Sequence, residues 1–237
     1  MGARPWYTGS VVPWTLLDRV PAGAHHGAVS LHRRGDEYSI RVDGQELMNS
    51  RRHGSEEAMA QFACAALGRM EQPRVMVGGL GMGFTLAASN RCLPADATID
   101  VVELVAAVVT WNRGTLGDVA GRPLSDARVQ VHHADVRDVL GAAHARYDAV
   151  LLDVDNGPDA FTQPANQWLY GRAGLARIRG ALRRGGVLSV WSARPDARFT
   201  ARLREADFET TTHRVGARGA AGGGQHTVWI AKARDLA

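Results

Sequence analysis

The sequence has few of the residues that build disulfide frameworks, metal sites and membrane spans. Its 237 residues include only two cysteines, Cys64 and Cys92, which form no CxxC pair, and its histidines show no metal-ligand spacing. We therefore expect no disulfide and no bound metal. No segment approaches the roughly 18 consecutive apolar residues of a membrane span, and the first residues contain no apolar signal core. These absences predict a cytoplasmic protein without membrane contact.

The sequence also has no marked excess of one charge. Lys and Arg number 28 against 24 Asp and Glu, which gives a formal net charge of +4 without a dense basic tract. Such a balance permits a nucleic-acid partner but does not indicate one. A chain of 237 residues, 45% of them hydrophobic, suits one α/β domain with a small appendage.

The first part of the chain predicts a β-hairpin. Apolar residues alternate over residues 28–50 around a polar turn at 34–36. Ser55, followed by two glutamates, is typical of a helix N-cap with an acidic first turn. We therefore predict a hairpin or lid element over residues 1–54 and a second domain over residues 55–237.

The rest of the chain alternates short apolar runs with helical segments. The runs are continuous in Val, Ile and Leu, which is typical of a parallel sheet buried on both faces. The last two runs flank a Gly-rich turn and are expected to pair antiparallel. This order resembles an α/β, Rossmann-like class I methyltransferase fold, with a mostly parallel seven-stranded sheet, a terminal antiparallel hairpin and helices on both faces. The runs cover residues 74–79, 98–104, 128–135, 147–155, 185–191, 208–215 and 226–233.

A glycine-rich turn follows the first run. Gly79, Gly81 and Gly83 form GxGxG around Leu80, between an apolar run and a helical segment. Glycine lets the chain reverse tightly and lets a ligand lie against bare backbone, where N–H groups and the helix N-terminus can hold a polar tail. The turn is thus a candidate cofactor site, although a merely tight connection would show the same glycines.

An acidic residue near the end of the second run makes the cofactor interpretation more specific. Glu103, next to Leu104, follows the glycine turn by about 20 residues, the spacing at which a carboxylate can bind both ribose hydroxyls. A helix-capping role for Glu103 remains open. A nicotinamide dinucleotide would need a third glycine where this chain has Phe84, so we expect S-adenosylmethionine instead.

The third and fourth runs end in carboxylates as well. Asp135 and Val136 suit the adenine amine and the adenine ring face, respectively. Asp153 and Asp155 end the fourth run, at the sheet edge where ligands of open α/β folds bind. Both are candidate catalytic residues, Asp153 also contacting the cofactor, although Asp155 could equally form a turn.

Together these segments resemble the spermidine synthase-like branch of the class I S-adenosylmethionine-dependent methyltransferases. The resemblance covers roughly residues 40–193. It implies that Glu103 binds the ribose, that Asp135 binds the adenine side, and that Asp153 helps to deprotonate an attacking amine. It also implies a possible homodimer. The segments that carry it are VDGQELMNSRRHGSEEAM, GGLGMG, VVELVAAVV, YDAVLLDVDNGP and LRRGGVLSVWSA.

Two departures from that family change the expected reaction. Spermidine synthases have an acidic residue in the glycine loop where this chain has Gly81, and the family's tyrosine before the gate-loop glutamate is Ser55 here. A loop carboxylate attracts the ammonium of decarboxylated S-adenosylmethionine and repels the carboxylate of the intact cofactor. Its absence favours intact S-adenosyl-L-methionine and methyl transfer to a small molecule, with Asp153 as base or positioning group.

Other activities remain open on the same fold. The protein could transfer an aminopropyl group from decarboxylated S-adenosylmethionine, or cyclise the donor and release methylthioadenosine. It could also bind the cofactor as a scaffold without catalysis. Trp191, at the end of the fifth run, could form an aromatic wall beside a sulfonium or could be a core residue.

Overall fold

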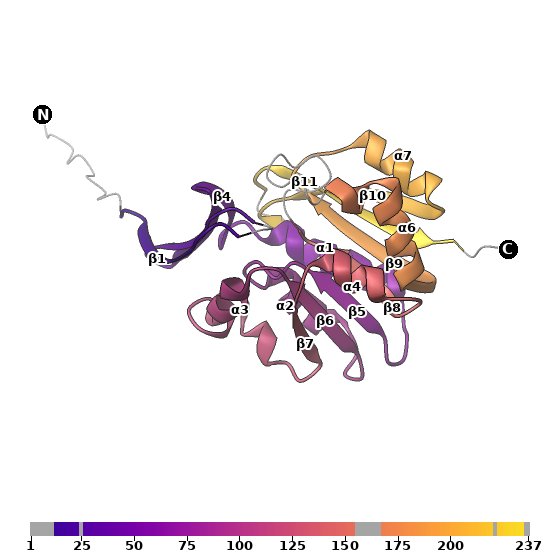
Figure 1. Ribbon diagram of the computed structural model, residues 1–237, viewed down its shortest axis with the longest axis horizontal. Coiled ribbons are helices and arrows are strands. Elements are labelled where there is room, and N and C mark those ends of the chain that lie inside the picture. Colours follow the sequence, from indigo (N-terminus) through magenta and orange to yellow (C-terminus); the bar gives the residue numbers. More distant parts are fainter. Residues whose placement is uncertain (1–11, 24–25, 155–166, 220–221, 235–237) are drawn as a thin grey trace, which may run out of the picture. The chain divides into compact units, whose positions relative to one another are not determined.

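The computed structural model (Figure 1) describes four stretches of the chain, residues 12–23, 26–154, 167–219 and 222–234. The chain divides into two units, Met1–Asn49 and Ser50–Ala237, a few residues before the boundary expected after residue 54. No helix in the described part is long and apolar enough to cross a membrane. Nor do three His, Cys, Asp or Glu side chains of that part gather as metal ligands.

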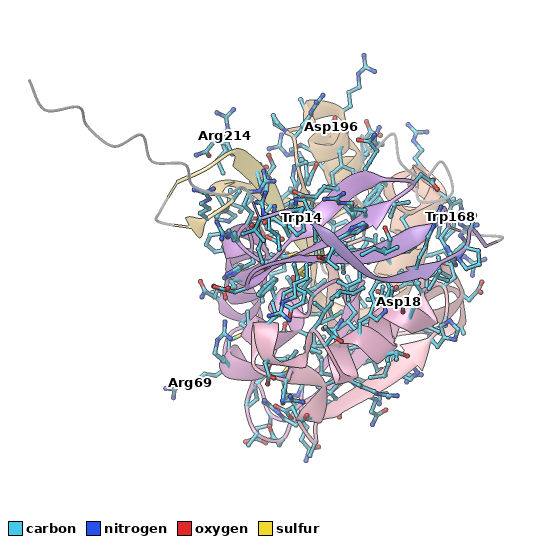
Figure 2. All side chains as sticks on the ribbon, turned by 90° about the vertical axis from the view of Figure 1, so that its left-hand side faces the viewer. Trp14, Asp18, Arg69, Trp168, Asp196 and Arg214 are labelled. Carbon is cyan, nitrogen blue, oxygen red and sulfur yellow. A yellow bond between two sulfur atoms is a disulfide. The ribbon has the colours of Figure 1, made fainter. Side chains whose placement is uncertain are left out.

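The first unit is an antiparallel sheet of four strands, β1 (Thr15–Val20), β2 (Val29–Arg34), β3 (Glu37–Val42) and β4 (Gln45–Asn49), which pair in that order. The predicted hairpin is its centre, where β2 and β3 pair across a turn in which Gly35 has φ of 60°. The sequence analysis missed β1, because a mostly exposed strand has no alternating buried face. Trp14, labelled in Figure 2, lies just before β1. The centroid of its ring lies 4.5 Å from the guanidinium carbon of Arg34.

The second unit contains a seven-stranded sheet with the order β10-β11-β9-β8-β5-β6-β7. The five strands from β5 to β9 are parallel, and β10 and β11 form an antiparallel hairpin beside β9. This confirms the predicted sheet and its terminal hairpin. The strands are β5 (Arg74–Gly78), β6 (Thr98–Glu103), β7 (Val129–His133), β8 (Tyr147–Leu152), β9 (Leu182–Ser192), β10 (Phe208–Gly216) and β11 (Gln225–Ala233).

Helices cover both faces of this sheet (Figure 1). On one face, α1 packs against α2 and against strands β8 to β11. On the other, apolar side chains of α4, α6 and α7 form a buried cluster with Met76, Val150 and Leu188 of the strands. The helices are α1 (Gly54–Leu67), α2 (Phe84–Cys92), α3 (Ala106–Arg113), α4 (Val136–Ala142), α5 (Gln167–Tyr170), α6 (Arg172–Ala181) and α7 (Ala197–Glu205), with 3-10 turns η1 (Gly117–Ala120) and η2 (Pro123–Ser125).

The expectation that the chain has no disulfide was wrong. Cys64 of α1 and Cys92 of α2 are joined by a disulfide across a sequence separation of 28 residues. The two cysteines come together because α1 and α2 pack side by side on one face of the sheet. The spacing of the cysteines does not predict this helix packing, because the packing depends on the order of the strands in the sheet.

Candidate active site

The glycine turn joins β5 to α2 and has the backbone that glycine allows. Gly79, Gly81 and Gly83 have φ of 88°, 51° and 85°, in the left-handed region where other residues are strained. A Cβ on Gly79 would lie 2.3 Å from the carbonyl oxygen of Asp153, so a side chain cannot be accommodated there. The N-cap of α2 is Gly83 itself, which provides no side-chain cap for the first N–H groups.

Glu103 lies at the end of β6 beside this turn, as the sequence predicted. Its side chain is buried, and its two carboxylate oxygens accept hydrogen bonds from the backbone N–H groups of Leu80 (2.9 Å) and Val105 (2.8 Å). Burial raises the pKa of Glu103, and the backbone donors partly oppose that rise. The carboxylate therefore links the glycine turn to the end of β6 by hydrogen bonds. The next residue, Leu104, accepts a hydrogen bond from His133 through its carbonyl oxygen.

Asp135 and Val136 lie at the end of the neighbouring strand, β7. Asp135 is the N-cap of α4, and its carboxylate accepts a hydrogen bond from the N–H of Arg137 at 2.8 Å. Val136 is buried beside the end of β5, where a Cβ on Gly78 would come within 3.0 Å of it. The adenine-binding role of both residues stays a prediction.

Asp153 follows β8 and contacts both the end of β5 and the start of α2. Its N–H donates to the carbonyl of Gly78 (2.9 Å), and its carboxylate accepts a short hydrogen bond from the hydroxyl of Thr85 (2.6 Å). Burial of the carboxyl raises the pKa of Asp153 to about 6, and the hydrogen bond from Thr85 partly opposes that rise. The carboxylate thus lies next to the glycine turn. Asp155, the other candidate catalytic residue, lies outside the described residues.

A second carboxyl group in this region was missed by the sequence analysis. Glu56, in the first turn of α1, is only 6% exposed, and its pKa is raised to about 8, first by burial and then by the charge of Asp153. Its neighbour Glu57, by contrast, has a side chain that is 34% exposed and pairs with His53 at the surface. Two adjacent glutamates at the start of a helix point in different directions, and here one of them points inward.

Ser55 connects Glu56 to the terminal hairpin. It was expected to cap α1, but the N-cap is His53, and Ser55 is fully buried instead. Its hydroxyl oxygen lies 2.6 Å from a carboxylate oxygen of Glu56, 2.8 Å from Nδ1 of His226 on β11 and 2.9 Å from the indole nitrogen of Trp191 on β9. Trp191 is thereby fixed as a buried residue, with its ring edge-on to that of His226.

The architecture matches solved structures of known proteins. No family model and no curated protein matches the sequence. The spermidine synthase of Thermotoga maritima superposes with a TM-score of 0.73 at 15% identity, over 92% of this chain and 72% of that one. The chain has the fold of spermidine synthases. A spermidine synthase in complex with the transition-state analogue AdoDATO matches with a TM-score of 0.71 at 14% identity, over 92% of this chain and 72% of that one. A probable spermidine synthase from Corynebacterium glutamicum ATCC 13032 matches with a TM-score of 0.64 at 17% identity, over 92% of this chain and 79% of that one.

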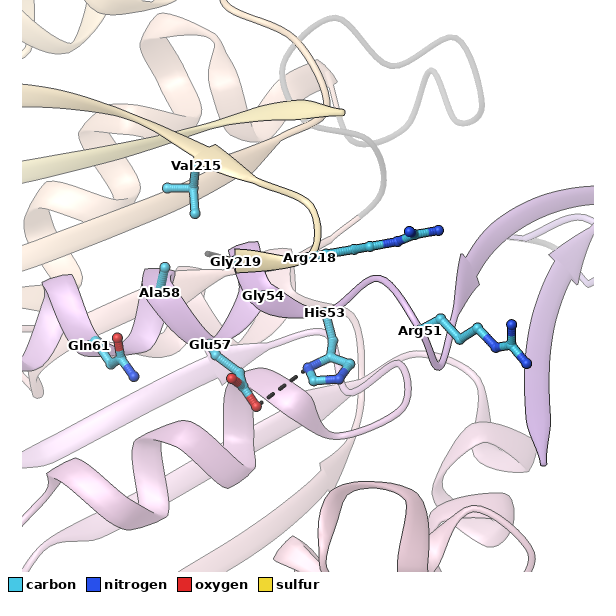
Figure 3. Close-up of a pocket in the computed structure, with 9 residues that line it drawn as sticks. All are labelled: Arg51, His53, Gly54, Glu57, Ala58, Gln61, Val215, Arg218 and Gly219. Atoms are coloured by element: carbon cyan, nitrogen blue, oxygen red, sulfur yellow. Dashed lines mark ion pairs between the residues drawn. The ribbon is translucent and has the colours of Figure 1, made fainter. Parts of the chain in front are cut away.

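A surface groove also borders α1 in this spermidine synthase fold (Figure 3). It encloses about 610 Å³, and the His53–Glu57 ion pair, with 3.4 Å between nitrogen and oxygen, lies on its wall. The carboxyl groups of Glu56 and Asp153 do not line it. The groove is thus distinct from the group of polar side chains at the strand ends, and that group is the candidate active site. The groove is lined by Arg51, His53, Gly54, Glu57, Ala58, Gln61, Val215, Arg218 and Gly219.

Proposed function

We propose that the protein is an aminopropyltransferase that uses decarboxylated S-adenosylmethionine as donor and a small amine as acceptor. The observation that carries this proposal is the carboxylate of Asp153, which Thr85 holds at the start of α2 and whose charge acts on the buried carboxyl of Glu56. The likeness to spermidine synthases, one of them bound to a transition-state analogue, supports it.

The residues around the glycine turn fit the adenosine part of such a donor. The uncapped start of α2 leaves N–H groups for a polar ligand. We assign the ribose hydroxyls to Glu103 and the adenine to Asp135 and Val136, at the ends of the next two strands. Leu80 and Leu104 would flank the nucleoside.

The second carboxyl group changes the expectation for the donor. The absence of a carboxylate at Gly81 favours the intact cofactor, yet Glu56 provides an acidic group that the sequence analysis did not place in the site. Because burial and the charge of Asp153 raise the pKa of Glu56 to about 8, Glu56 is mostly protonated near neutral pH. A bound ammonium group would draw off that proton and pair with the charge. A site with Glu56 and Asp153 is therefore suited to cationic ligands.

In the proposed reaction the sulfonium of the donor is already an activated leaving group. The acceptor amine attacks the carbon next to sulfur, the new C–N bond forms as the C–S bond breaks, and methylthioadenosine leaves. The amine loses one proton, which Asp153 would accept. With a pKa of about 6, Asp153 is mostly ionised at neutral pH and can act as that base. Thr85, which donates to Asp153, would hold the carboxylate in position.

Methyl transfer from intact S-adenosyl-L-methionine is the second candidate, and the missing loop carboxylate at Gly81 is the observation that favours it. The two reactions leave different products. Purified protein is incubated with each donor and a series of diamines, and the products are analysed by mass spectrometry. Methylthioadenosine together with an alkylated amine supports the proposal. S-adenosylhomocysteine supports methyl transfer, methylthioadenosine without any acceptor supports cyclisation, and donor binding without turnover supports a scaffold.

The protein's assembly and location also belong to this proposal. We expect a homodimer, as the resemblance to spermidine synthases implied, and a cytoplasmic protein, as the sequence without a signal core or membrane span predicted. Light scattering of the purified chain measures the first. Fractionation of cells that express the full-length protein measures the second.

A further inference from the structure

The buried hydroxyl of Ser55 has three polar neighbours, and their hydrogen-bonding capacity restricts what it can do. A serine hydroxyl has one proton to donate and two lone pairs to accept with. The indole N–H of Trp191, at 2.9 Å, can only donate, so it uses one lone pair. One proton and one lone pair remain for Glu56 and His226. Ser55 therefore donates to one of these two side chains and accepts from the other.

Two arrangements with a neutral His226 satisfy all of these contacts. In the first, ionised Glu56 accepts the hydroxyl proton at 2.6 Å, and neutral His226 carries its proton on Nδ1 and donates it to Ser55 at 2.8 Å. In the second, protonated Glu56 donates to Ser55, and Ser55 donates to a bare Nδ1 of His226, whose proton then lies on Nε2. The second arrangement becomes the first when one proton shifts along each of the two hydrogen bonds and His226 then loses its Nε2 proton.

We propose that Ser55 relays a proton from Glu56 to His226, which releases it to solvent and so returns the carboxyl pair to its starting state after each reaction. This inference rests on the proposed function, because the proton is the one that the acceptor amine loses. Glu56 gives its proton to the Ser55 oxygen while the Ser55 proton moves to Nδ1 of His226. The imidazolium then loses its Nε2 proton to water, so that charge and atoms balance.

The burial of the three side chains suits this direction of transfer. Ser55 is fully buried and Glu56 is 6% exposed, whereas His226 is only half-buried at the end of β11 nearest the glycine-rich turn. Burial and then the charge of Arg52 lower the pKa of His226, which keeps its imidazole neutral and ready to pass a proton on. At the other end, Asp153 and Glu57 act on Glu56 and raise its pKa.

The relay is tested in the free protein by nitrogen-15 NMR of the histidine rings between pH 6.5 and 9.5. The His226 signal is assigned by its absence in His226→Gln. We expect neutral His226 to carry its proton on Nε2 while Glu56 is protonated and on Nδ1 once Glu56 is ionised, and Ser55→Ala to abolish that switch. A His226 tautomer that stays the same through the Glu56 titration overturns the proposal. Glu57→Gln, a change at the partly exposed neighbour, should leave the switch in place.

A turnover measurement then tests whether the relay serves the reaction. In Ser55→Ala we expect kcat to fall by about 10-fold or more, with the donor KM unchanged, since general acid–base steps contribute at least that much. An unchanged kcat in a folded Ser55→Ala variant overturns the relay. The NMR experiment needs no donor, so a failure of the aminopropyltransferase assignment and a failure of the relay give different results.

Discussion

The buried carboxyl of Glu56 predicts a mutation that stabilises the protein in one pH range only. The pKa of Glu56 is raised from 4.5 to about 8, because burial and the nearby Asp153 disfavour its charge. A group with a raised pKa binds its proton more tightly in the folded state. Its contribution to stability is therefore complete below about pH 4.5, decreases as the pH rises, and is lost above about pH 8.

The size of this effect follows from the same pKa. One pH unit of pKa change corresponds to about 1.4 kcal/mol, so the ionisation of folded Glu56 above pH 8 costs on the order of 3 to 5 kcal/mol. The variant Glu56→Gln has no charge to bury and keeps similar volume and hydrogen-bonding atoms. Relative to wild type, it should have a higher free energy of unfolding at pH 8.5, and this advantage should be small at pH 4.5.

Urea unfolding followed by circular dichroism at pH 4.5, 6.5 and 8.5 measures this difference. Glu57→Gln is the matched control, because it changes the adjacent, partly exposed glutamate and should shift stability by less than about 1 kcal/mol at every pH. If Glu56→Gln is no more stable relative to wild type at pH 8.5 than at pH 4.5, the burial of an uncompensated carboxyl at this position is refuted. The assignment of Glu56 to a cation-binding site then loses its basis.

Three further substitutions test other parts of the site and fold. Glu103→Ala should weaken donor binding by about 1 to 3 kcal/mol in calorimetry, the loss expected when hydrogen bonds to a charged group are removed; an unchanged affinity would contradict its ribose role. Asp153→Asn should lower turnover by about 100-fold or more without lowering the melting temperature, whereas a turn-forming role predicts near-normal turnover and easier unfolding. Cys64→Ser should lower the free energy of unfolding by about 3 to 4 kcal/mol, because the link to Cys92 closes a loop with a separation of 28 residues. Reduction of the disulfide should destabilise the wild type by the same amount as Cys64→Ser and should leave the Cys64→Ser variant unaffected.

The sheet was predictable from the sequence because its signals are local. Continuous runs of Val, Ile and Leu between helical segments are needed for strands buried on both faces, and each run that was expected is a strand in the structure. The glycine turn and the acid at Glu103 were local signals too, since both follow strands whose ends are marked by the sequence. Strand β1 had no such signal, because it buries little of its surface.

The carboxyl pair and its neighbours could not be predicted in the same way, because they depend on contacts between distant residues. Ser55 and His226 are 171 residues apart, and only the position of the terminal hairpin beside β9 brings them together. Glu56 looks like any acidic residue in a helix's first turn until the face that packs against the sheet is known. The disulfide was missed for the same reason, since it depends on the packing of α1 against α2.

The contact between Gly79 and Asp153 affects any attempt to redesign the protein. The two chain segments approach so closely that a Cβ on Gly79 would lie 2.3 Å from the carbonyl oxygen of Asp153. Changing the glycine turn, which we propose binds the donor, therefore moves the residue proposed as base, and the two cannot be optimised one at a time. A glycine turn taken from another enzyme would have to be introduced together with that enzyme's segment after β8. The residues proposed for donor choice and for proton removal would then be replaced at the same time.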